Sequence, residues 1–231
     1  MNEKMNLLVW GAIPYAVIAI FVVGHLWRYK TAQYSWTTRS SQLLERKWLA
    51  VGIILFHVGM LAVLGGHIGG ILVPKSLTDS VGISEDMYHT VAVAMGSLAG
   101  IAMTSGLLIL AVRRVGNERV RAATISRDYL TVGVLLLVVF TGMINTFGVQ
   151  LLGEAYDYRE SVSPWFRSIF LLQPDPQLMA DAPWSFKLHA ASAMLLFAIW
   201  PFTRLVHAWS VPVGYLTRPH IIFRRRDSVA Q

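Results

Sequence analysis

The chain contains no cysteine and little charge. Of its 231 residues 14% are charged, against about 25% in ordinary soluble domains, and 55% are hydrophobic. Without cysteine there are no disulfides, no thiolate zinc sites, no cysteine-bound iron–sulfur clusters and no covalently attached c-type haem. Any metal must therefore be bound by histidine, methionine or carboxylate side chains.

The charge is missing from long stretches of the chain. Four runs of at least 23 residues carry no Asp, Glu, Lys or Arg, and a fifth, shorter run ends before Arg204. Because a helix needs about 20 apolar residues to cross a bilayer, the runs predict five transmembrane helices. These are expected over residues 5–27, 48–73, 88–112, 129–152 and 186–211, with a tail over 212–231. We therefore expect an all-α integral membrane protein, a single domain over residues 1–231 with five helices in a bundle.

The basic residues are distributed unevenly over the two sides of this bundle. The amino-terminal tail and the loops after the second and fourth helices hold 5 of the Lys and Arg residues, and the opposite side holds 15. Since cytoplasmic loops carry an excess of Lys and Arg, the amino terminus is predicted outside and the carboxy-terminal tail in the cytoplasm. The net charge of +7 then reflects topology and attraction to anionic lipid or an acidic cytoplasmic partner. No nucleic acid partner is expected.

Four histidines lie in two of the expected helices: His57 and His67 in the second, His189 and His207 in the fifth. Ionisable residues at membrane depth indicate function, and neutral imidazole can bind haem iron. Along a helix the first two are about 15 Å apart and the last two about 27 Å, a difference that tilt or inclined ligation must absorb. Because the two helices run antiparallel, His57 is predicted to meet His207 near the cytoplasm, and His67 to meet His189 near the outside.

Two His–iron–His bridges at two depths would make a path for electrons through the bilayer. Small residues beside the histidines favour a flat macrocycle there, namely Gly59, Gly65, Gly66, Gly69, Gly70, Ala190, Ala191 and Ala193. One alternative is that the histidines only pack between helices, among small-residue contacts such as Gly96-x-x-x-Gly100. Another is copper or zinc, although a tight site would need three or four converging ligands.

Three segments resemble the gamma subunit of respiratory nitrate reductase, a cytochrome b membrane anchor: residues 33–47, 55–70 and 186–218. The resemblance covers essentially the whole chain and implies a single membrane cytochrome b domain in the inner (cytoplasmic) membrane. It implies two b haems, the proximal on His57 and His207 and the distal on His67 and His189. It also implies that quinol is oxidised near the distal haem on the periplasmic side. Electrons would pass to a cytoplasmic iron–sulfur beta subunit and a molybdenum-containing alpha subunit that reduces nitrate.

The expected quinol site departs from this family. Its members carry a lysine just before the third helix, where this chain reads Glu85-Asp-Met-Tyr-His-Thr90. His89 and Tyr88 are the candidates for accepting the quinol proton, His89 first because imidazole titrates near neutral pH. Arg204, one turn before His207, is a candidate partner of a haem propionate or a positive-inside anchor. Alternative functions are the cytochrome b subunit of a heterodisulfide or sulfite-type reductase, and a haem-free membrane anchor or transporter.

Overall fold

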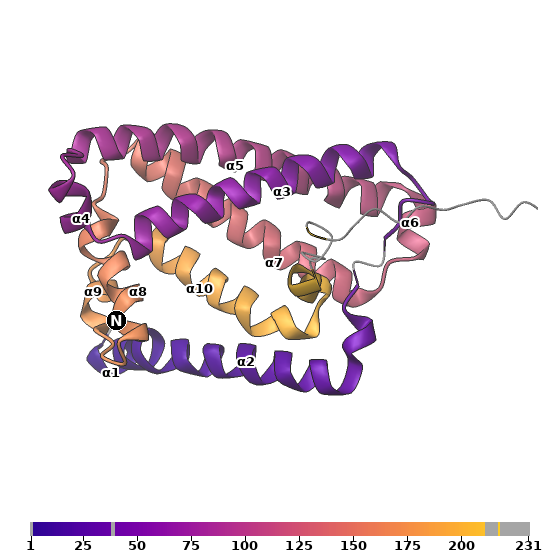
Figure 1. Ribbon diagram of the computed structural model, residues 1–231, viewed down its shortest axis with the longest axis horizontal. Coiled ribbons are helices and arrows are strands. Elements are labelled where there is room, and N and C mark those ends of the chain that lie inside the picture. The colour runs from indigo at the N-terminus through magenta and orange to yellow at the C-terminus, as the bar shows by residue number, and fades with distance from the viewer. Residues whose placement is uncertain (1, 38–39, 211–216, 218–231) are drawn as a thin grey trace, which may run out of the picture.

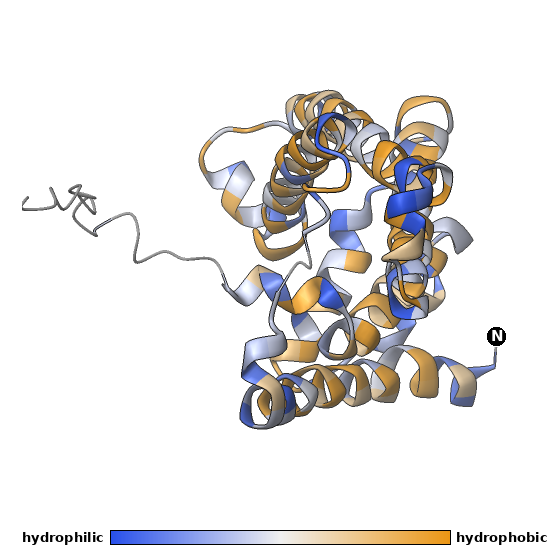
Figure 2. Cartoon of the chain, turned by 90° about the vertical axis from the view of Figure 1, so that its right-hand side faces the viewer, coloured by the Kyte–Doolittle hydropathy of each residue, from blue (hydrophilic) through white to orange (hydrophobic). Residues whose placement is uncertain are grey.

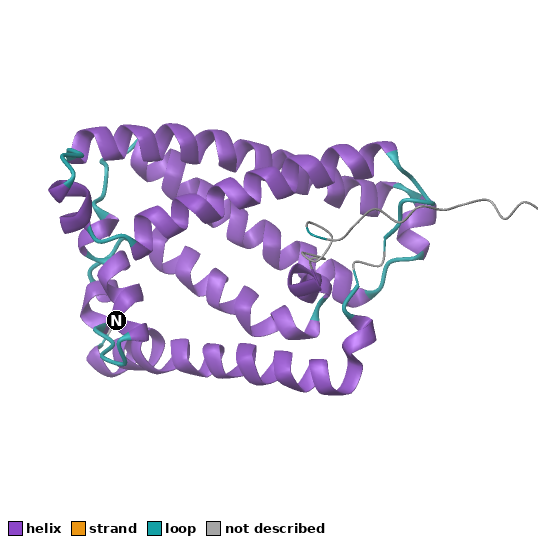
Figure 3. Cartoon of the chain, in the orientation of Figure 1, coloured by secondary structure: helices purple, strands orange, loops and turns teal. Residues whose placement is uncertain are grey.

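The structure is a computed structural model that describes residues 2–37, 40–210 and 217. Those residues form helices and no strands (Figure 3). Five segments are long and apolar enough to cross a membrane, Glu3–Ser35, Lys47–Leu72, Glu85–Gly116, Ser126–Leu151 and Trp184–Phe202. The prediction of an all-α fold with five helices long and apolar enough to span a membrane is confirmed for the described residues. The predicted tail over 212–231 lies outside the described residues, apart from Thr217.

Most spans combine a regular α-helix with a short π or 3-10 segment. The first span contains α1 (Glu3–Asn6), Leu7–Ala12, α2 (Ile13–Ala32) and Gln33–Ser35. The second is α3 (Lys47–His67) with Ile68–Leu72, and the third is α5 (Glu85–Gly116) alone. The fourth is α7 (Ser126–Met143) with Ile144–Leu151, and the fifth is α10 (Trp184–Ile199) with Trp200–Phe202. The short helices are α4 (Lys75–Ser80), α6 (Glu118–Ala122), α8 (Val162–Phe170) and α9 (Pro176–Ala180). Several spans are longer than predicted because charged residues at their ends remain helical.

Glycines bring α3 and α5 into close contact. A side-chain carbon on Gly59 of α3 would collide with the backbone of Met103, and one on Gly106 of α5 would collide with the backbone of Phe56. Gly59 therefore serves helix packing, and its expected role in making room for a macrocycle is corrected. By contrast, a carbon on Gly65 or Gly66 would meet nothing within 4 Å.

The helices that carry the histidines do not pack against each other. α3 packs along α5, whereas α10 packs against α7 and α2, and α3 and α10 share no packed interface in the described chain. Figure 1 shows α10 running between α2 and α7, with α3 on the far side from α2. Between α3 and α10, the rings of His67 and His189 face each other with their centroids 6.0 Å apart.

The predicted fifth helix over 186–211 is interrupted, which corrects the expectation of one continuous helix. α10 ends at Ile199, Pro201 lies in a 3-10 turn, and Thr203 is extended with φ −113° and ψ −178°. A second 3-10 segment, Arg204–Ser210, follows and carries His207. Proline prevents the helix from continuing, and Arg28 donates to the carbonyl oxygens of Pro201 and Thr203 at 2.7 and 2.6 Å. Because the chain turns here, the five-turn spacing between His189 and His207 does not apply.

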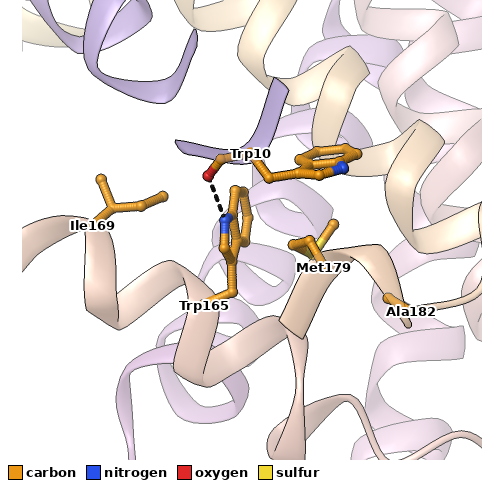
Figure 4. Packing of buried hydrophobic residues seen from close by; sticks show 5 residues of the cluster. All are labelled: Trp10, Trp165, Ile169, Met179 and Ala182. Carbon is orange, nitrogen blue, oxygen red and sulfur yellow. Dashed lines mark hydrogen bonds between the residues drawn. The ribbon is translucent and has the colours of Figure 1, made fainter. Parts of the chain in front are cut away.

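At the opposite end of the bundle, two short helices cover the start of the first span. Trp165 of α8 donates from its indole nitrogen to the carbonyl oxygen of Trp10 at 2.8 Å, and the two rings meet edge to face (Figure 4). Ile169, Met179 and Ala182 complete this buried cluster. It fixes the loop between the fourth and fifth spans against the first.

Large apolar side chains point outward from the helices. Leu61, Leu98 and Phe140 are each more than half exposed, and Figure 2 shows that the long helices consist largely of apolar residues. Such a surface would be unfavourable in water and suits lipid chains. The polar residues that matter for function lie inside the bundle and at its two ends.

Candidate functional site

The four membrane histidines form two facing pairs. The ring centroids of His57 and His207 are 6.3 Å apart, and those of His67 and His189 are 6.0 Å apart. The structure therefore brings together the same histidines that the sequence pairs, His57 with His207 and His67 with His189. The first pair lies toward the end of the bundle that holds Arg113, Asp128 and Arg204, called here the Arg113 end. The second lies toward the end that holds Lys75, Tyr88 and Asp157, called the Lys75 end.

The separation within each pair fits one metal atom between two imidazoles. A metal–nitrogen bond is about 2.0–2.1 Å long, and the ring nitrogen lies about 1.1 Å from the ring centroid. Two imidazoles on opposite sides of one metal atom therefore have centroids about 6.2–6.4 Å apart. Both pairs lie close to that value. No three His, Cys, Asp or Glu side chains come together among the described residues, so a copper or zinc site with three such ligands is not formed there. Two histidines per centre can supply the two axial ligands of a six-coordinate haem iron.

Each ring is held by a hydrogen bond to Nδ1. His57 and His67 bond the carbonyl oxygens of Ile53 and Val63, four residues earlier, at 2.9 and 2.8 Å. His207 bonds the carbonyl of Arg204 at 2.7 Å. Because a carbonyl only accepts, Nδ1 must carry the proton in these three rings, which leaves the lone pair on Nε2. This is the tautomer that binds metal through Nε2.

The fourth histidine is held from a different helix. Nδ1 of His189 lies 3.1 Å from Oγ1 of Thr141 in α7. A side-chain carbon on the next residue, Gly142, would lie 3.1 Å from Cε1 of His189, so the ring rests directly on the α7 backbone. α7 therefore positions a ligand candidate that belongs to α10.

A buried ion pair fixes the segment that carries His207. Asp128, whose side chain is 4% exposed, accepts from Nε of Arg204 at 2.8 Å, forms a second contact with Nη2 of the same arginine, and pairs with Arg114 at 3.4 Å. Arg204 was expected to bind a propionate or to anchor the helix end, and the structure places it on Asp128. Nearby, Arg113 binds the carboxylate of Glu45 at 2.5 Å.

Two tyrosines meet beside the helix of His67. The hydroxyl groups of Tyr88 and Tyr158 are 3.2 Å apart, and a side-chain carbon on Gly70 would lie 3.1 and 2.7 Å from them. Burial and then the contact with Tyr88 raise the pKa of Tyr158, so its phenol stays protonated. Arg159 stacks over the ring of Tyr88 at 3.8 Å. The absence of a side chain on Gly70 lets both hydroxyl groups approach one turn beyond His67.

The other quinol candidate faces a different helix. Nε2 of His89 lies 3.2 Å from Oε1 of Gln150, and the amide nitrogen of Gln150 donates to the carbonyl of Tyr156 at 2.7 Å. The two candidates from the sequence thus occupy different surroundings at the same end of the bundle. Tyr88 lies at the helix of His67, and His89 lies against the fourth span.

Three residues of the site were not anticipated from the sequence. Thr141 and Asp128 lie in α7, far in sequence from the histidines that they support, and Tyr158 lies in a loop 70 residues after Tyr88. A threonine inside an apolar run most often hydrogen-bonds a carbonyl of its own helix, so the sequence does not indicate that Thr141 contacts His189. Asp128 did carry a signal, because it is an acidic residue at the start of an apolar run.

Comparison with known proteins finds one family whose members resemble the chain over nearly its whole length. Residues 6–226 match the family described as nitrate reductase gamma subunit. The nitrate reductase gamma chain of Bacillus subtilis is 46% identical over 220 residues, covering 95% of this chain and 98% of that one. The respiratory nitrate reductase 1 gamma chain of Escherichia coli is 31% identical over 97% of this chain and 99% of its own. An Hdr-like menaquinol oxidoreductase cytochrome b-like subunit of Archaeoglobus fulgidus is 25% identical, over 72% of this chain and 49% of its own.

Proposed function

Because this chain belongs to the nitrate reductase gamma subunit family, and so is a subunit of an oxidoreductase complex, we propose that it holds two b-type haems and oxidises quinol. The observation that carries this proposal is the presence of two facing pairs of histidine rings. In each pair the rings are about as far apart as two axial ligands of one iron atom, and Nδ1 of every ring makes a hydrogen bond. His57 and His207 would hold the proximal haem, and His67 and His189 the distal haem. When bound, the haems supply one-electron carriers at two depths of the membrane.

The Arg113 end is proposed to face the cytoplasm and the Lys75 end the outside of the inner membrane. Exposed basic residues at the Arg113 end support this orientation, including Lys30, Arg46, Lys47, Arg119, Arg121 and Arg127. The family implies catalytic partner subunits, and we propose that the iron–sulfur beta subunit and the molybdenum-containing alpha subunit dock at this face. The amino terminus would then lie outside.

Quinol oxidation is proposed at the Lys75 end, beside His67. A quinol loses two electrons and two protons, so its hydroxyl groups need a hydrogen-bonding partner that orients them and a base that removes protons. Tyr88, supported by Tyr158, can orient a hydroxyl next to Gly70. His89 can accept a proton and pass it outward, since imidazole titrates near neutral pH. The Archaeoglobus relative, named as a menaquinol oxidoreductase subunit, supports quinol as the substrate class.

Haem analysis of the purified chain tests this proposal. Acid acetone should extract all of the haem, because no cysteine holds it covalently, and the extract should contain two haems per chain. Redox potentiometry should resolve two low-spin components. One haem, or a haem that remains with the protein, would contradict the assignment of four ligands, and no haem would leave the membrane anchor as the function.

Isolation of the native complex from membranes separates the proposed function from the sulfur-enzyme alternative. Partner subunits that contain molybdenum and iron–sulfur clusters, and that reduce nitrate with quinol as donor, should co-purify with the chain. Partners that reduce a heterodisulfide or sulfite would assign the chain to that alternative instead. His25→Ala serves as a control for histidine loss. His25 also bonds a carbonyl four residues earlier, but it faces Trp209 and no second histidine among the residues that the structure describes.

A further inference from the structure

We propose that Thr141 is a positioning residue for His189 that sets the reduction potential of the distal haem. The inference rests on the proposed function, because it assumes a haem between His67 and His189. Its basis is a difference among the four rings. Three of them bond carbonyl oxygens of their own segment, whereas the partners of His189 lie in another helix, namely the hydroxyl of Thr141 at 3.1 Å and the backbone of Val138.

In the tautomer that binds iron through Nε2, Nδ1 of His189 carries the proton and donates, and the contacts around Thr141 are consistent with this direction. Thr141 Oγ1 lies 2.9 Å from the carbonyl of Leu137 and 3.0 Å from that of Val138, in its own helix. Ser192 Oγ donates to the carbonyl of His189 at 2.8 Å and lies 3.1 Å from Thr141 Oγ1. With its single proton directed to a carbonyl or to Ser192, the threonine oxygen accepts from Nδ1–H of His189.

The site around Thr141 is closed on all sides. Thr141 is 1% exposed and Ser192 is 3% exposed, so water does not replace either partner. On the adjacent residue, the missing side chain of Gly142 lets the imidazole lie against α7. The ring of His189 is therefore fixed both by a hydrogen bond and by backbone contact, with its centroid 6.0 Å from that of His67.

This contact has an electronic consequence for a bound iron. A hydrogen bond from the distal nitrogen of a ligating imidazole increases the basicity of the nitrogen that binds the metal. A more basic ligand stabilises ferric over ferrous iron, and loss of the bond therefore raises the reduction potential. Since Thr141 belongs to α7, the fourth span controls the potential of a haem held by the second and fifth.

The test compares Thr141→Val, Thr141→Ser and Thr131→Val by redox potentiometry and electron paramagnetic resonance of the purified complex. Thr131 is the matched control, because it is also a buried threonine of α7, 2% exposed, and within the described part of the chain its hydroxyl bonds only the carbonyl of Arg127, at 2.7 Å. In Thr141→Val we expect the ferric–ferrous equilibrium of the distal component to shift by about tenfold, which is about 59 mV for one electron, toward a higher potential. Thr141→Ser should retain the original value, and the proximal component should not move.

Selective loss of the distal haem in Thr141→Val, with retention in Thr141→Ser, would also support the inference. A distal potential and resonance spectrum unchanged in Thr141→Val, or shifted equally by Thr131→Val, would overturn it. So would the same loss of haem in Thr141→Ser. If the unmodified complex lacks a second haem component, the proposed function fails and this inference fails with it.

Discussion

At the Arg113 end His207 lies in a 3-10 segment beyond the end of α10, whereas at the Lys75 end His189 lies within the regular helix. The irregular segment is tied down by charge, through Arg204 and the buried carboxylate of Asp128. The regular helix needs only a hydroxyl contact from Thr141 and a close approach at Gly142. Similar separations within the two pairs are thus reached by different means.

The difference shows where each pair is vulnerable. A buried carboxylate that loses its charge removes an ion-pair partner from two arginines, and such losses are expensive. A neutral hydroxyl that is lost costs one hydrogen bond. We therefore expect the His57–His207 pair to depend on ion pairing and the His67–His189 pair on local packing.

The largest effect should follow from removing a ligand candidate. His57→Ala and His207→Ala should each abolish the same haem component, and His67→Ala and His189→Ala should each abolish the other, because a haem with one remaining axial ligand loses most of its binding specificity. Optical difference spectra and haem content per chain measure this loss. If His57→Ala and His67→Ala removed the same component, the pairing seen in the structure would not be the pairing of ligands.

Much of this arrangement could be predicted from the sequence. The uncharged runs located all five spans. Antiparallel helices with two histidines each predicted the partners whose rings lie close together in the structure. The ends of the spans were less predictable, because Arg28 and Lys30 remain helical although they interrupt the uncharged run. Pro201 indicated a bend, but only the structure shows that Thr203 becomes extended and that Arg28 binds the freed carbonyl groups.

The next largest effect should come from Asp128→Asn. The amide cannot balance Arg114 and Arg204, so the free energy of unfolding should fall by about 3–5 kcal/mol, the usual cost of breaking a buried ion pair. The haem on His57 and His207 should be lost before the other during unfolding by dodecyl sulfate. Glu118→Gln, an exposed acidic residue at the same end, is the control. Simultaneous loss of both haems in Asp128→Asn would mean that the ion pair supports the bundle as a whole.

An intermediate effect is expected for the quinol site. His89→Leu should slow reduction of the haems by quinol by about 10²-fold, because it removes the proton acceptor, and Tyr88→Phe should slow it by about 2–10-fold, because it removes one hydrogen bond. Stopped-flow reduction kinetics measure both, and the haem spectra should stay intact. Unchanged kinetics in His89→Leu with a clear loss in Tyr88→Phe would exchange the two roles. No effect in either would move the site away from this loop.

Polar contacts between distant segments were the part that the sequence could not supply. Tyr158 and Thr141 become relevant only through the fold, which brings a loop to Gly70 and α7 to His189. The position of Arg204 one turn before His207 makes it a candidate from the sequence, but its partner Asp128 lies 76 residues earlier. Sequence spacing predicts which residues share a face of one helix. It does not predict which polar side chains of different segments form hydrogen bonds or ion pairs.

The smallest effect is expected at the ion pairs of Lys75, which contrast with those of Asp128. Lys75 bonds Asp157 at 2.7 Å and Glu160 at 2.8 Å, but its side chain is 29% exposed and that of Glu160 is 68% exposed. Exposed pairs contribute about 0.2–1 kcal/mol and are screened by salt. Lys75→Gln should therefore lower the free energy of unfolding by less than about 1 kcal/mol, and the loss should shrink further in high salt, whereas the cost of Asp128→Asn should persist.

The pH dependence sharpens the same contrast. Hydrogen bonds to Asp157 and Glu160 raise the pKa of Lys75 above its usual value. A raised lysine pKa means that the stabilisation is complete below the ordinary lysine pKa and is lost only as the pH rises through the still higher value in the folded protein. The difference in unfolding free energy between the unmodified protein and Lys75→Gln should thus be constant between about pH 6 and about pH 9. A difference that changed within this range, measured by dodecyl sulfate titration at each pH, would show that a group other than Lys75 controls this end of the bundle.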